Sequence, residues 1–95
     1  MEDVIITLIS IGETADDDVK TSVFATKDPI SRDEFNAAGQ ARMKARHKFT
    51  IWASEYDNQE EVDFDGDRLS IYRTYGTRRD GKIELYTAER VGNGS

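Results

Sequence analysis

The apolar and polar positions of the chain form short runs that predict strands. Residues Val4–Ile11 are dominated by β-branched side chains and end at Gly12, a pattern typical of a strand that is buried for much of its length. An acidic loop over residues 13–18 separates this run from a second predicted strand, Val19–Ala25. The two strands are expected to form an antiparallel pair.

A single helix is predicted next, because Asp28-Pro29 is expected to end the second strand. The stretch Ser31–Glu34 has the form of a capping box, in which the serine hydroxyl accepts from a helix amide while Glu34 reaches back. Apolar residues then recur at helical spacing over Arg32–Ala45. This apolar face is mostly alanine, and Gly39 costs about 1 kcal/mol relative to alanine in a helix interior. We therefore expect a weakly held helix that a neighbouring subunit orders.

Alternation of apolar and polar residues resumes in the second half of the chain and predicts four more strands, at His47–Ala53, Val62–Phe64, Leu69–Thr74 and Ile83–Ala88. Asp-Gly dipeptides at 65–66 and 80–81 predict tight turns between them. The fold class is thus mainly β, a small six-stranded antiparallel barrel or sandwich with one helix inserted between strands 2 and 3. We expect a single domain over residues 1–91 and a flexible tail over residues 92–95.

Composition excludes several classes of protein. With 95 residues, of which 37% are apolar and 34% charged, the chain has room for one domain with a thin core. It has no cysteine and one histidine, which excludes disulfide scaffolds, thiolate zinc sites and histidine clusters. The longest apolar run is too short to span a bilayer and follows acidic residues instead of a basic leader segment. A soluble protein without a membrane partner is expected.

The net charge of −6 is divided into blocks of opposite sign. Residues 1–41 carry nine acidic and three basic side chains, 42–48 four basic and none acidic, 49–67 seven acidic and none basic, and 68–95 six basic and three acidic. Such blocks are either solvated faces or complementary patches that pair copies of the chain. The second interpretation sets Lys48 against an acidic group in a neighbouring copy, formed by Glu55, Asp57, Glu60 and Glu61.

The basic block supports three interpretations. In an extended segment, alternate side chains point to one side, so Arg42, Lys44, Arg46 and Lys48 would form a basic ridge there. This ridge is a solvated surface, a contact with the acidic block of another copy, or a contact with a phosphate backbone.

No catalytic or metal motif emerges from the sequence. A calcium-binding EF-hand loop that begins at Asp63 requires a glutamate at its twelfth position, where Thr74 stands, so a hairpin turn is expected instead. His47 lacks the orienting carboxylate and nucleophile motif of a catalytic triad. Phosphate-binding glycine motifs are absent as well. We expect a protein that is not an enzyme and uses no cofactor, metal or small-molecule substrate.

The order of these features resembles the bacteriophage head-tail joining family, also described as head-closure, stopper or head-tail adaptor proteins. Chains of that family run through a "VWA"-like strand end, an "SGxExxxA"-like helix, a "THxFxIRY"-like strand, a "yDGxxYxI" hairpin and a final "lEL" strand. The corresponding stretches here are Ser22–Ala25, Ser31–Ala37, Arg46–Ile51, Phe64–Ile71 and Lys82–Leu85. The likeness covers nearly the whole chain.

This resemblance implies a homo-oligomeric ring in the virion neck, assembled in the host cytoplasm, between the portal-adaptor complex and the tail. It also implies that the segment Asp28–Arg46 projects towards the channel and helps to retain packaged double-stranded DNA. The residues expected to act there are Asp28, Ser31, Glu34, Phe35, Arg42, Lys44 and Arg46. Two alternatives remain open: a tail-terminator ring of the same neck, and a module that stacks single-stranded nucleic acid on Trp52, Tyr72, Tyr75 and Tyr86.

Overall fold

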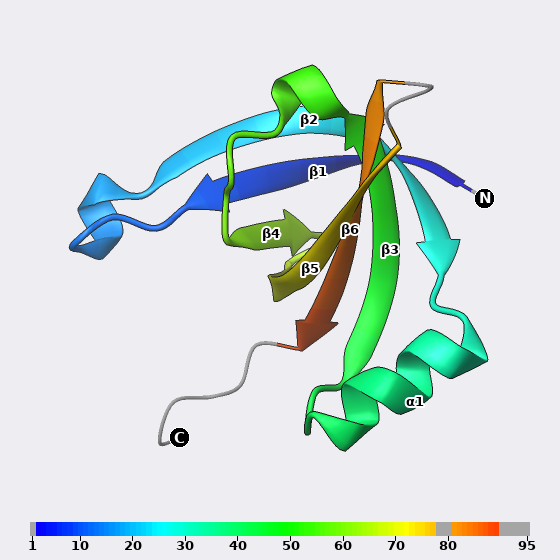
Figure 1. Cartoon of the computed structure of the whole chain (residues 1–95). Coiled ribbons are helices and arrows are strands. Elements are labelled where there is room, and N and C mark those ends of the chain that lie inside the picture. Colours follow the sequence, from blue (N-terminus) through cyan, green and yellow to red (C-terminus); the bar gives the residue numbers. More distant parts are fainter. Residues whose placement is uncertain (1, 78–80, 90–95) are drawn as a thin grey trace.

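The computed structural model describes residues 2–77 and 81–89, which form a mainly β fold (Figure 1). The strands are β1 (Glu2–Ser10), β2 (Val19–Pro29), β3 (Ala45–Trp52), β4 (Glu61–Phe64), β5 (Asp67–Thr77) and β6 (Lys82–Glu89). One α-helix, α1 (Arg32–Gln40), lies between β2 and β3, and short 3-10 turns occur at η1 (Ala15–Asp17) and η2 (Ala53–Glu55). Six strands with a helix between the second and third confirm the predicted element order within the described residues.

The strands close into an antiparallel barrel in the order β1-β2-β3-β6-β5-β4. Two meanders, β1-β2-β3 and β4-β5-β6, are joined by the β3–β6 and β1–β4 pairs. Closure removes most of the exposed strand edges that an open sheet of this size would present. Of the two predicted architectures, the barrel is therefore the one that forms.

The core lies inside the barrel and consists of the inward residues of the alternating strands. Phe49 is completely buried, and its ring meets that of Phe64 edge-to-face at 5.3 Å between centroids. Thr87 is also buried, and its hydroxyl donates to the carbonyl oxygen of His47 at 2.9 Å. The other buried members of the cluster are aliphatic: Ile6, Leu8, Val23, Ala25, Ile51, Val62, Leu69 and Leu85.

The predicted second strand, Val19–Ala25, is four residues too short, but the stop expected at Asp28-Pro29 is confirmed, because β2 ends at Pro29. This strand continues through Thr26–Pro29, because these residues pair with β3 from Thr50 to His47. Pro29 is the last residue of the strand, so the N–H that proline lacks removes no backbone hydrogen bond from the middle of the sheet.

The predicted end of the helix is also wrong, because α1 stops at Gln40 and Ala45 belongs to β3. The N–H of Met43 donates to Ala38 O at 2.8 Å, and that of Arg42 donates to Gly39 O at 2.9 Å. This is the Schellman pattern, with Arg42 at the left-handed position (φ 63°) that glycine usually occupies.

The β4–β5 hairpin turns at Asp65 and Gly66, whose φ angles are 53° and 85°. Two consecutive positive φ values define the type I′ turn that an Asp-Gly pair favours, so this predicted turn is confirmed. In the described ranges, no group of three or more histidine or acidic residues is placed to hold a metal ion. Asp80 of the second predicted turn and the tail at 92–95 lie outside the described residues. No helix among residues 2–77 and 81–89 is long and apolar enough to cross a membrane.

Candidate docking and gating site

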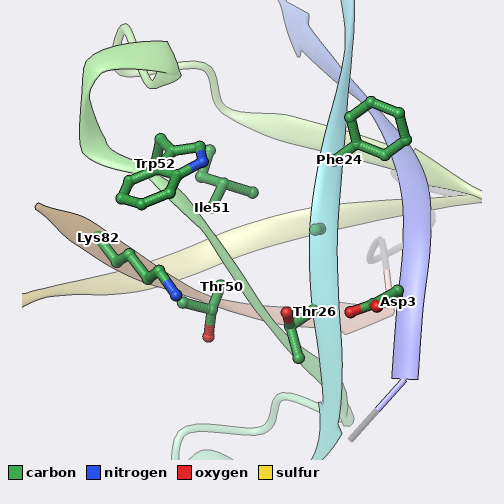
Figure 2. Close-up of a pocket in the computed structure, with 8 residues that line it drawn as sticks. Asp3, Phe24, Thr26, Thr50, Ile51, Trp52 and Lys82 are labelled. Atoms are coloured by element: carbon green, nitrogen blue, oxygen red, sulfur yellow. The ribbon is translucent and has the colours of Figure 1, made fainter. Parts of the chain in front are cut away.

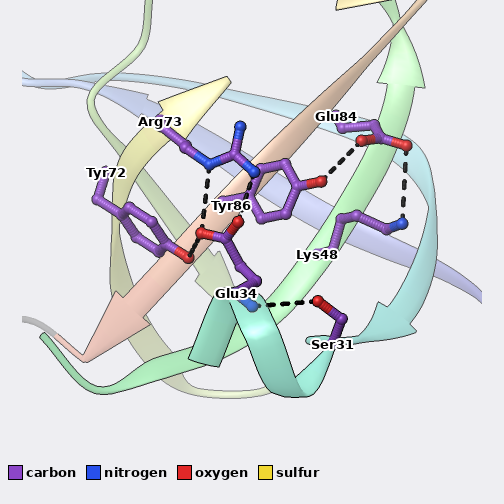
Figure 3. A network of polar contacts seen from close by, with 7 residues as sticks. All are labelled: Ser31, Glu34, Lys48, Tyr72, Arg73, Glu84 and Tyr86. Carbon is purple, nitrogen blue, oxygen red and sulfur yellow. Dashed lines mark hydrogen bonds and ion pairs between the residues drawn. The ribbon is translucent and has the colours of Figure 1, made fainter. Parts of the chain in front are cut away.

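Helix α1 lies beyond one end of the barrel, between the ends of β2 and β3 (Figure 1). Its N-terminus is capped by Ser31, whose hydroxyl oxygen accepts from the Glu34 N–H at 3.2 Å. This half of the predicted capping box is confirmed. The other half is wrong, because the Glu34 carboxylate points to β5 (Figure 3).

The carboxylate of Glu34 fastens the helix to the barrel wall. It accepts hydrogen bonds from the Tyr72 hydroxyl at 2.6 Å, from Arg73 Nε at 3.2 Å and from Arg73 Nη2. A β-bulge between Ile71 and Arg73 interrupts the strand register at Tyr72, and both side chains reach the same carboxylate. We call Glu34, Tyr72 and Arg73 the helix latch.

The electrostatics of the helix latch favour the ionised carboxylate. Hydrogen bonds from Arg73 and then from Tyr72 hold the pKa of Glu34 below its usual value. Burial, together with the hydrogen bond to Glu34, raises the pKa of the Tyr72 hydroxyl well above its usual value. The latch is therefore a charged pair with a neutral tyrosine donor near pH 7.

The helix latch continues into a polar network on the outer face of β3, β6 and β5 (Figure 3). The Arg73 guanidinium lies 3.9 Å from the centroid of the Tyr86 ring, and the Tyr86 hydroxyl donates to Glu84 at 2.9 Å. Lys48 Nζ lies 3.6 Å from the same Glu84 carboxylate. Lys48, which we expected at a subunit contact, thus has a partner within its own chain.

The predicted basic ridge does not form as one row. Arg42 and Lys44 are exposed in the turn after α1, outside any strand. Arg46 lies at a bulge of β3, and its guanidinium pairs with Glu89 at 3.0 Å and Asp67 at 3.6 Å. Arg42 and Lys44 are therefore the charges of the basic block that lie in this turn, whereas Arg46 and Lys48 have ion-pair partners on the strands.

Two further residues of the predicted gating segment lie beside a pocket. Asp28 and Phe35 line a hollow of about 520 Å³ between α1 and the end of the barrel, together with Lys27, Ile30 and His47. Phe35 remains 53% exposed, so the helix uses little of its apolar surface for contact with the barrel.

The acidic block is divided between surface and interior. Glu55, Asp57 and Glu60 are exposed on the connection between β3 and β4. Glu61 is only 6% exposed and pairs with Arg68, which also reaches Asp18 at 3.2 Å. We call Arg68, Asp18 and Glu61 the arginine clamp.

The arginine clamp holds the loop between β1 and β2 against β5. Asp18 accepts from the backbone N–H of Gly12 at 2.9 Å, and this bond, together with Arg68, lowers the pKa of the Asp18 carboxyl. The loop before β2 and the β4–β5 hairpin, which are far apart in the sequence, thereby meet at one guanidinium. Sequence reasoning assigned Glu61 to a subunit surface and missed this internal role.

The four aromatic residues of the nucleic-acid alternative do not form one free stacking surface. Trp52 and Tyr75 are 54% and 57% exposed, but Lys82 lies 5.2 Å from the centroid of the Trp52 ring. The hydroxyls of Tyr72 and Tyr86 are bonded to carboxylates. A stacking platform needs open ring faces beside cations, and the acidic groups beside Tyr72 and Tyr86 oppose a phosphate backbone.

A notch that was not predicted lies where β2 and β3 separate (Figure 2). Their pairing extends only from Pro29–His47 to Thr26–Thr50, and beyond it opens a hollow of about 380 Å³. Phe24 on β2 and Trp52 on β3 line this notch, and Phe24 is 77% exposed. The alternation of Val23, Phe24 and Ala25 does predict that Phe24 faces outward.

His47 has a packing role in this structure. Its ring lies edge-on between Phe49 and Phe64, at 5.7 and 5.6 Å between centroids. Burial lowers its pKa, and the charges of Lys27 and Arg46 act in the same direction. A neutral imidazole is suited to this aromatic cluster.

Comparison with known proteins adds no family to these observations, because no protein-family model and no curated protein matches the chain. The functional argument therefore starts from the fold, the helix latch and the exposed surfaces.

Proposed function

We propose that the protein is a non-enzymatic connector subunit of a phage or prophage neck, which forms a ring between the portal-adaptor complex and the tail. In this role it closes the filled head, helps to retain packaged DNA and offers the tail a docking surface. The observation that supports the proposal is the position of α1, which lies beyond one end of a closed barrel, between β2 and β3. The resemblance implies a gating segment at this point of the chain.

The attachment of α1 suits an element that moves. Ala38 is the buried residue of the helix, and the polar helix latch supplies the tie to β5. Polar contacts at a partly exposed site exchange readily with water, so α1 can swing without opening the apolar core.

The turn after α1 suits contact with DNA. Arg42 holds a left-handed conformation that costs a non-glycine residue about 1–2 kcal/mol. Glycine would relieve this strain but would remove the guanidinium. With the exposed Lys44, Arg42 presents two positive charges to a phosphate backbone at the end of the molecule.

The exposed charges suit a head-to-tail ring. Glu55, Asp57 and Glu60 of one copy face the turn at Arg42 and Lys44 of the next copy, as a heterologous contact that closes. Lys48 and Glu61 keep their partners inside each copy.

Electron microscopy of the protein mixed with portal-adaptor complexes of DNA-filled heads tests the proposal. We expect a ring of density at the portal end, with less DNA released on dilution. The Arg42→Gly, Lys44→Ala variant removes the charges that face both the DNA and the acidic block of the next copy, so it is expected to weaken the ring and to release more DNA. Heads that stay bare with the wild-type protein overturn the proposal, and density on tail tubes instead supports the tail-terminator alternative.

A further inference from the structure

Part of β2 has a strand neighbour on one side only. Its pairing with β1 runs without a register break from Lys27 to Val19, whereas β3 pairs with Thr26–Pro29 alone. Within the described residues, the stretch Val19–Ala25 therefore presents an unpaired edge. Natural proteins protect such edges with proline, bulges or charges. This stretch contains no proline and no bulge, and its one charge is Lys20.

Apolar side chains lie beside this edge and have no cover in the described structure. Phe24 is 77% exposed, and its cross-strand neighbour Ile5 is 61% exposed. The notch next to Phe24 has Trp52 on its far wall (Figure 2). A strand added to the β2 edge would complete the backbone hydrogen bonds and would shield this apolar surface in one step.

We propose that the free edge of β2 binds the same edge of a second copy, antiparallel, with a two-fold axis at Ser22. This register pairs the whole stretch, with Val19 opposite Ala25 and Thr21 opposite Val23. It also places Lys20 of each copy opposite Phe24 of the other, where an ammonium group and an aromatic ring attract each other. The two lysines do not face each other.

Charge complementarity at the ends of the stretch favours a second copy as the occupant. The exposed Asp16 and Asp17 lie just before Val19 in each chain. In the antiparallel pair, this acidic turn lies beyond Ala25 of the other copy, next to that copy's notch. Lys82 is one of the residues that line the notch. One sequence thus supplies both halves of the contact, as an isologous interface requires. The inference goes beyond the connector proposal, because ring contacts are heterologous and this contact belongs to the free subunit.

A single cysteine at the axis tests the register. The chain has no cysteine, so Ser22→Cys introduces the only thiol. Side chains directly opposite each other on antiparallel strands have Cβ atoms about 4.5–5.5 Å apart, close to the geometry of a disulfide. We expect Ser22→Cys to form a covalent dimer under mild oxidation at least tenfold faster than Asn36→Cys, a matched control on the exposed face of α1. Equal rates overturn the proposed axis.

Charge at the axis gives an independent test by sedimentation. Ser22→Arg and Ser22→Asp each place like charges opposite each other, so each variant alone is expected to be monomeric. A mixture of the two is expected to form a heterodimer. A monomeric wild-type protein, or a dimer that neither substitution weakens, overturns the inference. Failure of the ring to form on heads affects the connector proposal alone, because these measurements use the isolated protein.

Discussion

Glu34 on α1 and Arg73 on β5 are 39 residues apart in the sequence, and their ion pair joins the helix to the barrel wall. The Glu34 side chain is 14% exposed and that of Arg73 is 43% exposed. The ion pair is thus exposed to solvent on the Arg73 side. Solvent limits its strength, but the exposure also lets a partner compete for either charge.

Glu34→Gln tests whether this pair holds the helix. The amide oxygen still accepts from Tyr72, but the attraction to Arg73 is lost, so we expect the free energy of unfolding to fall by about 1 kcal/mol. Hydrogen exchange of the α1 amides should accelerate while the core amides of Phe49 and Leu85 remain protected. Asp33→Asn, which changes an exposed carboxylate in the same turn, serves as the control. Unchanged protection of α1 would show that the latch does not hold the helix.

The helix latch also predicts a dependence on pH. The pKa of Glu34 is lower in the folded protein than its ordinary value of 4.5, so the stabilisation by the helix latch is complete above pH 4.5. This stabilisation is lost as the pH falls through the folded pKa. Urea unfolding of the wild type and Glu34→Gln at a series of pH values should give curves that converge below pH 4.5. If the difference in the free energy of unfolding between the two proteins stays constant down to strongly acidic pH, ionisation of Glu34 is not the source of the stabilisation.

Local signals predicted much of the fold. The Ser31 cap and the Asp65-Gly66 turn each depend on residues within one turn of chain, and both formed as expected. Alternation identified the strands because one face of each is buried in the barrel. The end of α1 was missed because a Schellman turn is normally signalled by glycine, and Arg42 occupies that position.

The candidate site depends on contacts that sequence order does not reveal. Glu34 meets Tyr72 only because β5 carries a bulge there, and the bulge depends on the register of β5 against β6. Similarly, the free edge of β2 exists because β3 pairs with the last residues of that strand alone. The internal role of Glu61 required Arg68 and Asp18 to meet across the barrel wall.

Arg42→Gly is expected to stabilise the protein. Glycine adopts the left-handed conformation without steric cost, and the gain exceeds its extra entropy in the unfolded chain, for a net increase of about 1 kcal/mol. Thermal unfolding measures the shift, with Lys44→Gly as a control at a neighbouring position without a positive φ. A lower melting temperature for Arg42→Gly would mean that the arginine makes a stabilising contact that outweighs its strain.

Arg68→Met is expected to destabilise the barrel through its effect on Glu61. Removal of the guanidinium takes the Arg68 charge away from a carboxylate that is only 6% exposed. The double variant Arg68→Met, Glu61→Leu removes both charges and should recover much of the lost stability. Chemical denaturation of both variants and of Glu61→Leu completes the cycle. If the losses in the free energy of unfolding of the two single variants add up to that of the double variant, Arg68 and Glu61 do not interact.

Two glycine-to-alanine changes should have opposite effects. A Cβ at Gly12 would press on the Asp17 side chain and lie 2.6 Å from the Asp17 carbonyl oxygen, whereas one at Gly39 meets nothing within 4 Å. Gly12→Ala must therefore displace backbone in the loop that the arginine clamp holds, at a cost of about 1–3 kcal/mol. Gly39→Ala removes a flexible residue from the helix interior and should stabilise by up to about 1 kcal/mol. The urea midpoint of Gly12→Ala should lie below the wild-type value and that of Gly39→Ala above it. A raised midpoint for Gly12→Ala would contradict the close packing of Gly12 against Asp17, and a lowered one for Gly39→Ala would contradict the open space around Gly39.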